Sequence, residues 1–192
     1  MQSLSHAEVE GILTPMDDRL PQGTIQVDSE RYGALLQVVE AIASHADLQG
    51  LVQDLARLLP LLVPVNFVGL SLYDAQRDMM RLHVLRANVP ADIIGGQESH
   101  PSDTPAGLVW QTQQPVILSD LAEEHRWPKL IALMREDAVQ SCCLVPLTSA
   151  VRQLGALAFS SLEKDAYRVS DLELMQQIGR HVAFAVEHVL NR

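Results

Sequence analysis

Apolar residues at helical spacing predict two helices early in the chain. Between residues 30 and 44 they form one stripe, and between 47 and 59 leucines and valines recur at intervals of three and four residues. Asp47 is suited to cap the second helix, and Pro60 marks its end. Residues 1–29 show no sustained period, so we expect a loose leader followed by helices at 30–44 and 47–59.

Apolar residues at every second position predict strands in the middle of the chain. The sequence FVGLSLYD at 67–74 is largely uncharged on both parities, which is typical of a strand covered on both faces. A short polar turn follows it and favours a hairpin with the next strand. The pattern predicts strands at 65–74, 79–87, 115–121, 139–149 and 152–162.

Helix breakers and capping residues place the remaining elements. Residues 88–103 hold two prolines and two glycines and predict a long loop. A short helix is expected over 104–112, which begins with the capping pair Thr-Pro, and another after Pro128. A closing helix is expected over 170–190, with Ser170 as its candidate cap.

The composition supports one folded domain over residues 30–192. Apolar residues make up 47% of the 192 residues and charged residues 20%, which is enough to bury one core and too apolar for a disordered chain. Hairpin strands with helices at both ends predict an α+β fold built on an antiparallel sheet.

Charge and hydropathy exclude two kinds of partner. The net charge of −10 repels phosphate backbones, so we expect no direct binding to nucleic acid. The uncharged run 58–73 has 16 residues and contains prolines, and no uncharged run is longer. A membrane span needs roughly 20 apolar residues. The N-terminus also has no basic start and no apolar signal segment. We therefore expect a cytoplasmic protein without a membrane partner.

The chain carries no motif of a known enzyme or metal site. Phosphate-binding loops, nucleophile elbows and zinc-protease patterns are absent from the sequence, and the seven histidines show no ligand spacing. Cys142 and Cys143 are adjacent, which strains a disulfide and directs the two thiols to opposite faces of a strand. We interpret them as small apolar core residues, with a thiol redox sensor as the alternative. The sequence predicts no catalytic residue and no metal.

Four sequence blocks, taken in order, resemble a GAF domain. They are FVGLSLYD, GLVWQTQQPVILSDL, VQSCCLVPL, and RQLGALAFSSL running on to DLELMQQIGRHVAFAVE, and the resemblance covers about 31–190. It implies an antiparallel sheet with the terminal helices on one face and a short helix plus loops over the other. It further implies a bacterial sensing and dimerisation domain that precedes an effector in a longer chain, similar to those of NtrC-class transcriptional activators.

The cofactor-specific members of that family have signatures that this chain lacks. Bilin attachment uses a cysteine commonly followed by histidine, whereas Leu144 follows Cys143. The Asn-Lys signature of cyclic-nucleotide binding does not align, since Phe67 follows Asn66. The methionine sulfoxide reductases of the family use separated cysteines. The resemblance therefore implies no identifiable cofactor and leaves an unknown small molecule as the ligand.

The expected ligand pocket lies between the sheet and a cover formed by residues 88–138. Loops over a rigid sheet commonly form a concave site. Phe67, Ser71 and Tyr73 share the parity that carries polar groups, so we assign this face to the pocket and the opposite face to the terminal helices. Core packing is the alternative for the histidine and both tryptophans among the candidates. The candidate ligand-binding residues are Phe67, Ser71, Tyr73, His83, Trp110, Trp127 and Cys143.

The closing helix carries an apolar stripe that has two interpretations. Its positions are spaced by three and four residues, as in a heptad seam. The stripe either packs only on its own sheet or forms the seam of a homodimer that continues into the effector. The dimer would use Leu35 and Val39 of the first helix with Met175, Ile178, Val182, Ala185 and Val189.

These observations together predict a non-enzymatic sensory domain. A small ligand under the cover would shift the population of cover conformations, and the terminal helices would pass this shift to the effector. One alternative is a purely structural dimerisation module without a ligand. A thiol-based redox sensor or enzyme is a further alternative.

Overall fold

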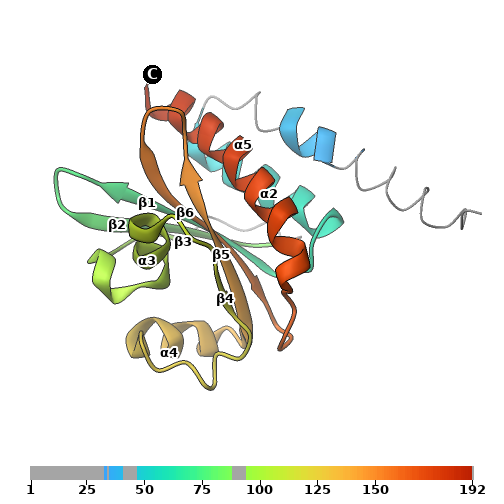
Figure 1. Ribbon diagram of the computed structural model, residues 1–192, viewed down its shortest axis with the longest axis vertical. Coiled ribbons are helices and arrows are strands. Elements are labelled where there is room, and N and C mark those ends of the chain that lie inside the picture. Colours follow the sequence, from blue (N-terminus) through green and yellow to red (C-terminus); the bar gives the residue numbers. More distant parts are fainter. Residues whose placement is uncertain (1–32, 34, 41–46, 88–93, 192) are drawn as a thin grey trace, which may run out of the picture.

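Six antiparallel strands form one sheet in the order β3-β2-β1-β6-β5-β4 (Figure 1). The computed structural model describes residues 33, 35–40, 47–87 and 94–191. The strands are β1 Phe67–Asp74, β2 Met79–Arg86, β3 Ile94–Ser99, β4 Val116–Leu118, β5 Ser141–Thr148 and β6 Gln153–Ser161. The helices are α2 Leu48–Leu58, α3 Pro105–Thr112, α4 Pro128–Glu136 and α5 Leu172–Leu190, with the 3-10 turns η1 Leu59–Leu61, η2 Pro101–Asp103 and η3 Val169–Asp171. The predicted α+β class with an antiparallel sheet is confirmed.

Helices α2 and α5 cover one face of the sheet (Figure 1). Leu51 and Leu55 of α2 and Ile178 of α5 are fully buried and share one core with Leu70 and Leu157 of the sheet. Each helix buries a single apolar face, because its apolar residues recur every three or four positions. The prediction that terminal helices cover this face is confirmed for these two helices.

The predicted dimer seam of α5 is this same buried face. Met175, Ile178, Val182 and Ala185 are buried in the core under the helix. The dimer-interface prediction is therefore wrong for these four residues, because a coiled-coil seam and a sheet-packing stripe have nearly the same spacing. The other three residues of the predicted interface are half-buried, namely Leu35, Val39 and Val189.

Helices α3 and α4 and the loop that leads from β4 into α4 cover the opposite face (Figure 1). Helix α3 begins as predicted, because Thr104 Oγ1 accepts a hydrogen bond from the Gly107 N–H at 3.0 Å. Val109 of α3, Ile131 of α4 and Trp127 of the loop are buried in a second core on this face. The sheet therefore separates two cores, as the two uncharged parities of β1 predict.

The edge strand β3 lies within a segment that the sequence predicts to be a loop. Gly96 adopts a φ of +94°, and the pairing of β3 with β2 shifts register between Leu82 and His83. An edge strand has a partner on one side only and needs no continuous apolar pattern, so pairing with β2 decides its conformation. Residues 94–99 thus belong to the sheet and not to the cover. The predicted leader and residues 88–93 lie outside the described residues.

Two predicted helix caps have different outcomes. Asp47 caps α2, since its Oδ1 accepts a hydrogen bond from the Gly50 N–H at 2.7 Å. Ser170 does not cap α5, because it lies within η3 and α5 begins two residues later at Leu172. The extra turn is anchored by Asp171, whose Oδ2 accepts a hydrogen bond from the Arg168 N–H at 3.1 Å.

Candidate functional site

A cavity of about 180 Å³ lies between the sheet and the cover. Strands β1, β2, β5 and β6 form its floor, and the start of α3 and the inner side of α4 form its roof. We call it the cover cavity. Most of its lining is apolar, including Phe67, Met80, Val84, Ala106, Leu144 and Ala158.

A few polar groups reach the cover cavity from different elements. Thr104 lies at the start of α3, where its hydroxyl oxygen already accepts the capping hydrogen bond. Ser160 of β6 donates a hydrogen bond to Cys142 Sγ at 3.4 Å. Asp137 is the single charged residue among the described residues that line the cavity, and no lysine, arginine or histidine is among them. Such a lining suits a small, mainly apolar molecule with few hydrogen-bonding groups.

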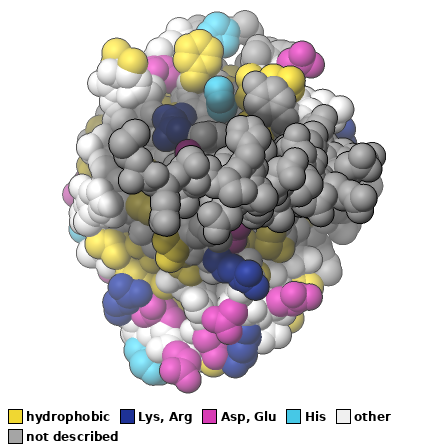
Figure 2. Space-filling view, turned by 45° about the vertical axis from the view of Figure 1, so that its right-hand side comes forward, with side chains coloured by type: hydrophobic (Ala, Val, Ile, Leu, Met, Phe, Trp, Pro, Cys, Tyr) yellow, Lys and Arg dark blue, Asp and Glu magenta, His cyan; other side chains and the backbone are white. Residues whose placement is uncertain are grey.

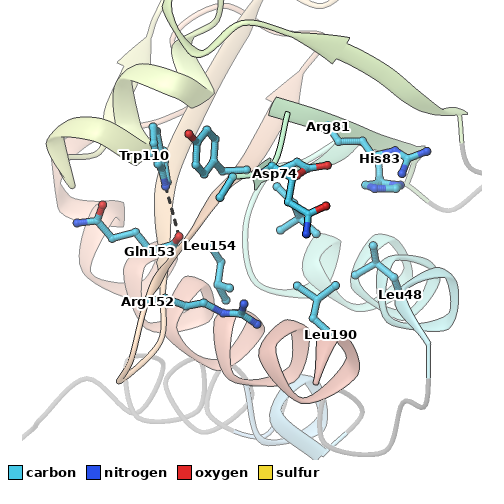
Figure 3. Close-up of a pocket in the computed structure, with 13 residues that line it drawn as sticks. Leu48, Asp74, Arg81, His83, Trp110, Arg152, Gln153, Leu154 and Leu190 are labelled. Carbon is cyan, nitrogen blue, oxygen red and sulfur yellow. Dashed lines mark hydrogen bonds between the residues drawn. The ribbon is translucent and has the colours of Figure 1, made fainter. Parts of the chain in front are cut away.

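A second, larger hollow of about 740 Å³ lies at one end of the sheet (Figure 3). It lies between the start of α2, the end of α5, and the turns that join β1 to β2 and β5 to β6. We call it the end pocket. Its lining includes the apolar residues Leu48, Leu72, Leu154 and Leu190 and the polar residues Arg81, His83 and Arg152.

An aromatic pair forms one wall of the end pocket. The rings of Tyr73 and Trp110 stack with centroids 3.8 Å apart and an interplanar angle of 26°. Trp110 Nε1 donates to the Gln153 carbonyl oxygen at 3.3 Å, and the Tyr73 hydroxyl donates to Asp78 Oδ1 at 2.7 Å. The hydrogen bond to Asp78 raises the pKa of Tyr73, so this phenol stays protonated at neutral pH. Both rings are thus held in place by their polar ends.

The structure divides the predicted ligand-binding residues among several places. Phe67 lines the cover cavity, and Tyr73 and Trp110 line the end pocket. Ser71 is buried on the cover side of β1, where it pairs with Leu82 of β2. It is not among the described residues that line either hollow. The assignment of this parity of β1 to the cover side is confirmed, whereas ligand binding by these residues stays a prediction.

Trp127 belongs to the core of the cover. Its ring is buried among the residues of the second core, and the Arg126 guanidinium lies 4.4 Å from the ring centroid on its outer side. Arg126 is held there by Glu124, and this pairing lowers the pKa of the Glu124 carboxyl to about 2. Trp127 therefore fits the alternative of core packing.

Two candidates lie on the wrong side of the sheet for the predicted pocket. His83 pairs with Leu70, so its side chain is on the helix face of β2 and lines the end pocket. Cys143 packs in the helix-face core, whereas Cys142 lines the cover cavity. Placing His83 and Cys143 under the cover was wrong, because neighbouring residues of a strand point to opposite faces and the register fixes which.

The sequence analysis missed several residues of the cover cavity. Met80, Leu82 and Val84 lie opposite Tyr73, Ser71 and Gly69 in the β1–β2 hairpin and share their face. The signal was present, because the hairpin register follows from the short turn at 75–78. Leu130 and Met134 of α4 carried no such signal, since only the docking of the helix on the sheet places them.

Both thiols are in environments that suppress their reactivity. Burial raises the pKa of Cys142 to about 11 and that of Cys143 to about 12. Reactive cysteines are partly exposed and have lowered pKa values. The structure therefore favours the reading of this pair as small core residues.

The described part of the chain contains no cluster of three or more metal-ligating side chains from His, Cys, Asp and Glu. None of the helices within it is long and apolar enough to cross a membrane.

Solved structures with the same fold include GAF domains. The GAF domain of an Acinetobacter phosphoenolpyruvate-protein phosphotransferase superposes with a TM-score of 0.68 at 15% identity, covering 84% of this chain and 95% of that one. A free methionine-R-sulfoxide reductase of Neisseria meningitidis, solved with its substrate, gives 0.66 at 16% identity over 85% and 92%. Identities this low establish the fold alone.

The chain belongs to the GAF domain family, whose sequence model matches residues 45–187. Among curated proteins it is similar to the formate hydrogenlyase transcriptional activator FhlA of Escherichia coli, at 22% identity over 171 residues. It is also similar to the DNA-binding transcriptional activator HyfR of the same organism, at 24% identity over 173 residues. These matches cover 85% and 84% of this chain, which spans about a quarter of the length of either relative.

Proposed function

We propose that this GAF domain is a regulatory sensor that binds a small, mainly apolar molecule in the cover cavity. The observation that carries the proposal is a cavity of about 180 Å³ between the sheet and a helical cover, with an apolar lining and no described cationic side chain. Apolar cavities of about 150 Å³ accept benzene in other proteins. The similarity to portions of transcriptional activators supports a regulatory role.

Helix α4 is the part of the cover best suited to respond to a ligand. Ile131 is its only buried residue, while Leu133, which lines the cavity, is 43% exposed. Elements with few buried contacts open at low cost in free energy. A ligand that fills the space between α4 and the sheet adds contacts only in the closed state, and so shifts the population toward closure.

Strand β5 links the cover cavity to α5. Cys142 and Leu144 line the cavity on one face of β5. Val145 is on the other face of the strand and packs in the core beneath the helices. A Cβ added at Gly179 of α5 would lie 3.0 Å from Val145 Cγ2 and 3.1 Å from the Pro146 oxygen, so helix and strand are in close contact. A shift in β5 is therefore transmitted to α5, and a coupling of about 1–3 kcal/mol suffices for regulation.

The proposal is tested by hydrogen exchange with phenol as the probe. We expect phenol to slow amide exchange in α3 and α4, because it occupies the space beneath them. Ala158→Met fills the floor of the cavity and should abolish the effect. Ala132→Met adds the same side chain to the exposed face of α4 and should leave it intact. Unchanged exchange with saturating phenol, or equal protection in both variants, would overturn the proposal.

We also propose that this domain forms a homodimer, and that the outer side of α5 is the dimer interface. Phe184 is 70% exposed there, and Leu36 in the helical residues 35–40 is 48% exposed. Hydrophobic and histidine side chains gather at the upper edge of the surface in Figure 2, whereas acidic and basic side chains are interspersed over its lower part. Exposed large apolar groups of this kind favour contact with another protein surface.

A further inference from the structure

The end pocket combines apolar walls with arginine side chains on two sides (Figure 3). Leu48 of α2, Leu154 of β6 and Leu190 of α5 approach it from three elements, and Leu190 is 51% exposed. Its volume of about 740 Å³ lies within the range of small-molecule sites, which is roughly 300–1,000 Å³. The hollow is large enough for an organic molecule with an apolar body.

Arg81 supplies the positive charge on one side of the end pocket, and His83 lies on the same strand beside it. Both lie on the helix face of β2, since they pair with Leu72 and Leu70 of β1. Arg81 is exposed and makes no side-chain hydrogen bond or ion pair within the described part of the chain. A guanidinium without a partner among the described residues can donate two parallel hydrogen bonds to a carboxylate.

Arg152 forms the opposite side and is held by the end of α5. Its Nη2 donates to Asn191 Oδ1 at 3.1 Å, and its Nε lies 3.5 Å from Glu187 Oε1. The acidic lining residue, Asp74, is committed to its own turn, because its Oδ1 accepts from the N–H groups of Gln76 and Arg77. Arg81 is thus the side chain of this pocket best placed to bind an anion, on a chain whose net charge is −10.

We propose that the end pocket binds an organic carboxylate with an apolar body, such as a medium-chain fatty acid. The carboxylate pairs with Arg81, and the apolar body lies against the leucines. The cover cavity shares no described lining residue with the end pocket and has no described cation in its lining, so the two hollows select ligands of different charge. The proposal is independent of what the cover cavity binds.

Trp110 provides a direct readout of the end pocket. It lines the pocket, and Trp127, the other tryptophan of the chain, is buried in the core of the cover. In the variant Trp127→Phe, Trp110 is the sole tryptophan. Its fluorescence can be titrated with octanoate, and with 1-octanol as the neutral analogue, once circular dichroism has shown the variant to be folded.

The decisive variant in this background is Arg81→Gln, which keeps most of the side-chain length and removes the charge. We expect octanoate to bind more tightly than octanol, and Arg81→Gln to weaken octanoate about tenfold or more without affecting octanol, as loss of a charge-assisted hydrogen bond predicts. Arg77→Gln is the matched control, since Arg77 lies in the same hairpin but pairs with Glu98 outside the pocket. It should bind octanoate like its parent.

Three results would overturn the proposal. They are the absence of saturable octanoate binding, equal affinity for octanoate and octanol, and equal octanoate affinity with and without Arg81→Gln. Adding Ala158→Met to this background shows which of the two hollows binds octanoate. Octanoate binding that disappears on filling the cover cavity would place the anion there and refute the end pocket, whereas unchanged binding supports it.

Discussion

Cys142 and Cys143 are neighbours in sequence but belong to different cores. Cys142 lines the cover cavity, and Cys143 is sealed between the sheet and its helices. The alternation of side chains along a strand predicts this division, but it does not say which residue faces which side. The same ambiguity applies to His83, whose side is fixed by its pairing with Leu70. At the scale of single residues, the strand register determines which side chains line each hollow.

His83 makes the stability of the protein depend on pH. Burial lowers its pKa below the usual 6.5, and the charge of Arg81 lowers it further. The unfolded chain therefore binds a proton more readily than the folded chain, so the free energy of unfolding falls as the pH drops through the unfolded-state pKa of about 6.5. We expect His83→Gln to flatten this part of the profile in urea denaturation at a series of pH values. A profile of the same slope in both proteins would contradict the prediction.

The elements of this fold differ in how far their local sequence specifies them. Helices α2 and α3 have both a cap and an apolar pattern, and both form where the sequence predicts them. Strand β3 has neither and forms only because it pairs with β2. Helix α4 begins at Pro128 as expected, but its position over the cavity depends on the burial of Ile131.

The cap of α3 gives a prediction at this scale. Thr104→Ala removes the acceptor for the Gly107 N–H, and we expect the free energy of unfolding to fall by about 1 kcal/mol. Thr112→Ala is the control, because that exposed hydroxyl donates to the Leu108 carbonyl oxygen at the other end of the helix. Urea denaturation of both variants measures the difference. A loss in Thr112→Ala equal to that in Thr104→Ala would show that the cap has no special role.

At the scale of the whole molecule, the proposed homodimer depends on the outer side of α5 as its interface. The stripe that resembles a dimer seam is buried on the sheet, which leaves Phe184 as the large apolar group on the opposite side of the helix. A homodimer built on this surface places the two α5 helices side by side. Ligand-dependent movement of α5 would then alter the spacing of whatever follows it in each chain.

Phe184→Glu tests this assembly. We expect the unmodified chain to be a dimer by native mass spectrometry and light scattering, and the variant to be a monomer, because a buried unpaired carboxylate opposes association. Val151→Glu makes the same change at a residue that is 78% exposed in the turn between β5 and β6, and it should remain a dimer. A monomeric parent chain, or a dimeric Phe184→Glu, would exclude this interface.

The sequence by itself determined the class of the fold, the order of most elements and the two-sided nature of β1. Helical spacing, strand alternation and caps are local signals, and they act within a few residues. They were sufficient for the helices α2, α3 and α5, and for the assignment of Phe67 and Tyr73 to the cover side of the sheet.

Only the tertiary structure decided where the hollows lie and what lines them. The cover cavity joins residues of β1, β2, β5 and β6 to α4, and the end pocket joins Leu48 of α2 to Leu190 of α5, which are far apart in the sequence. Such sites depend on strand register and on how helices dock, and a shift of one residue reverses every side chain of a strand. The α5 stripe makes the same point, because its spacing fits a dimer seam and a sheet equally well until its partner in the fold is known.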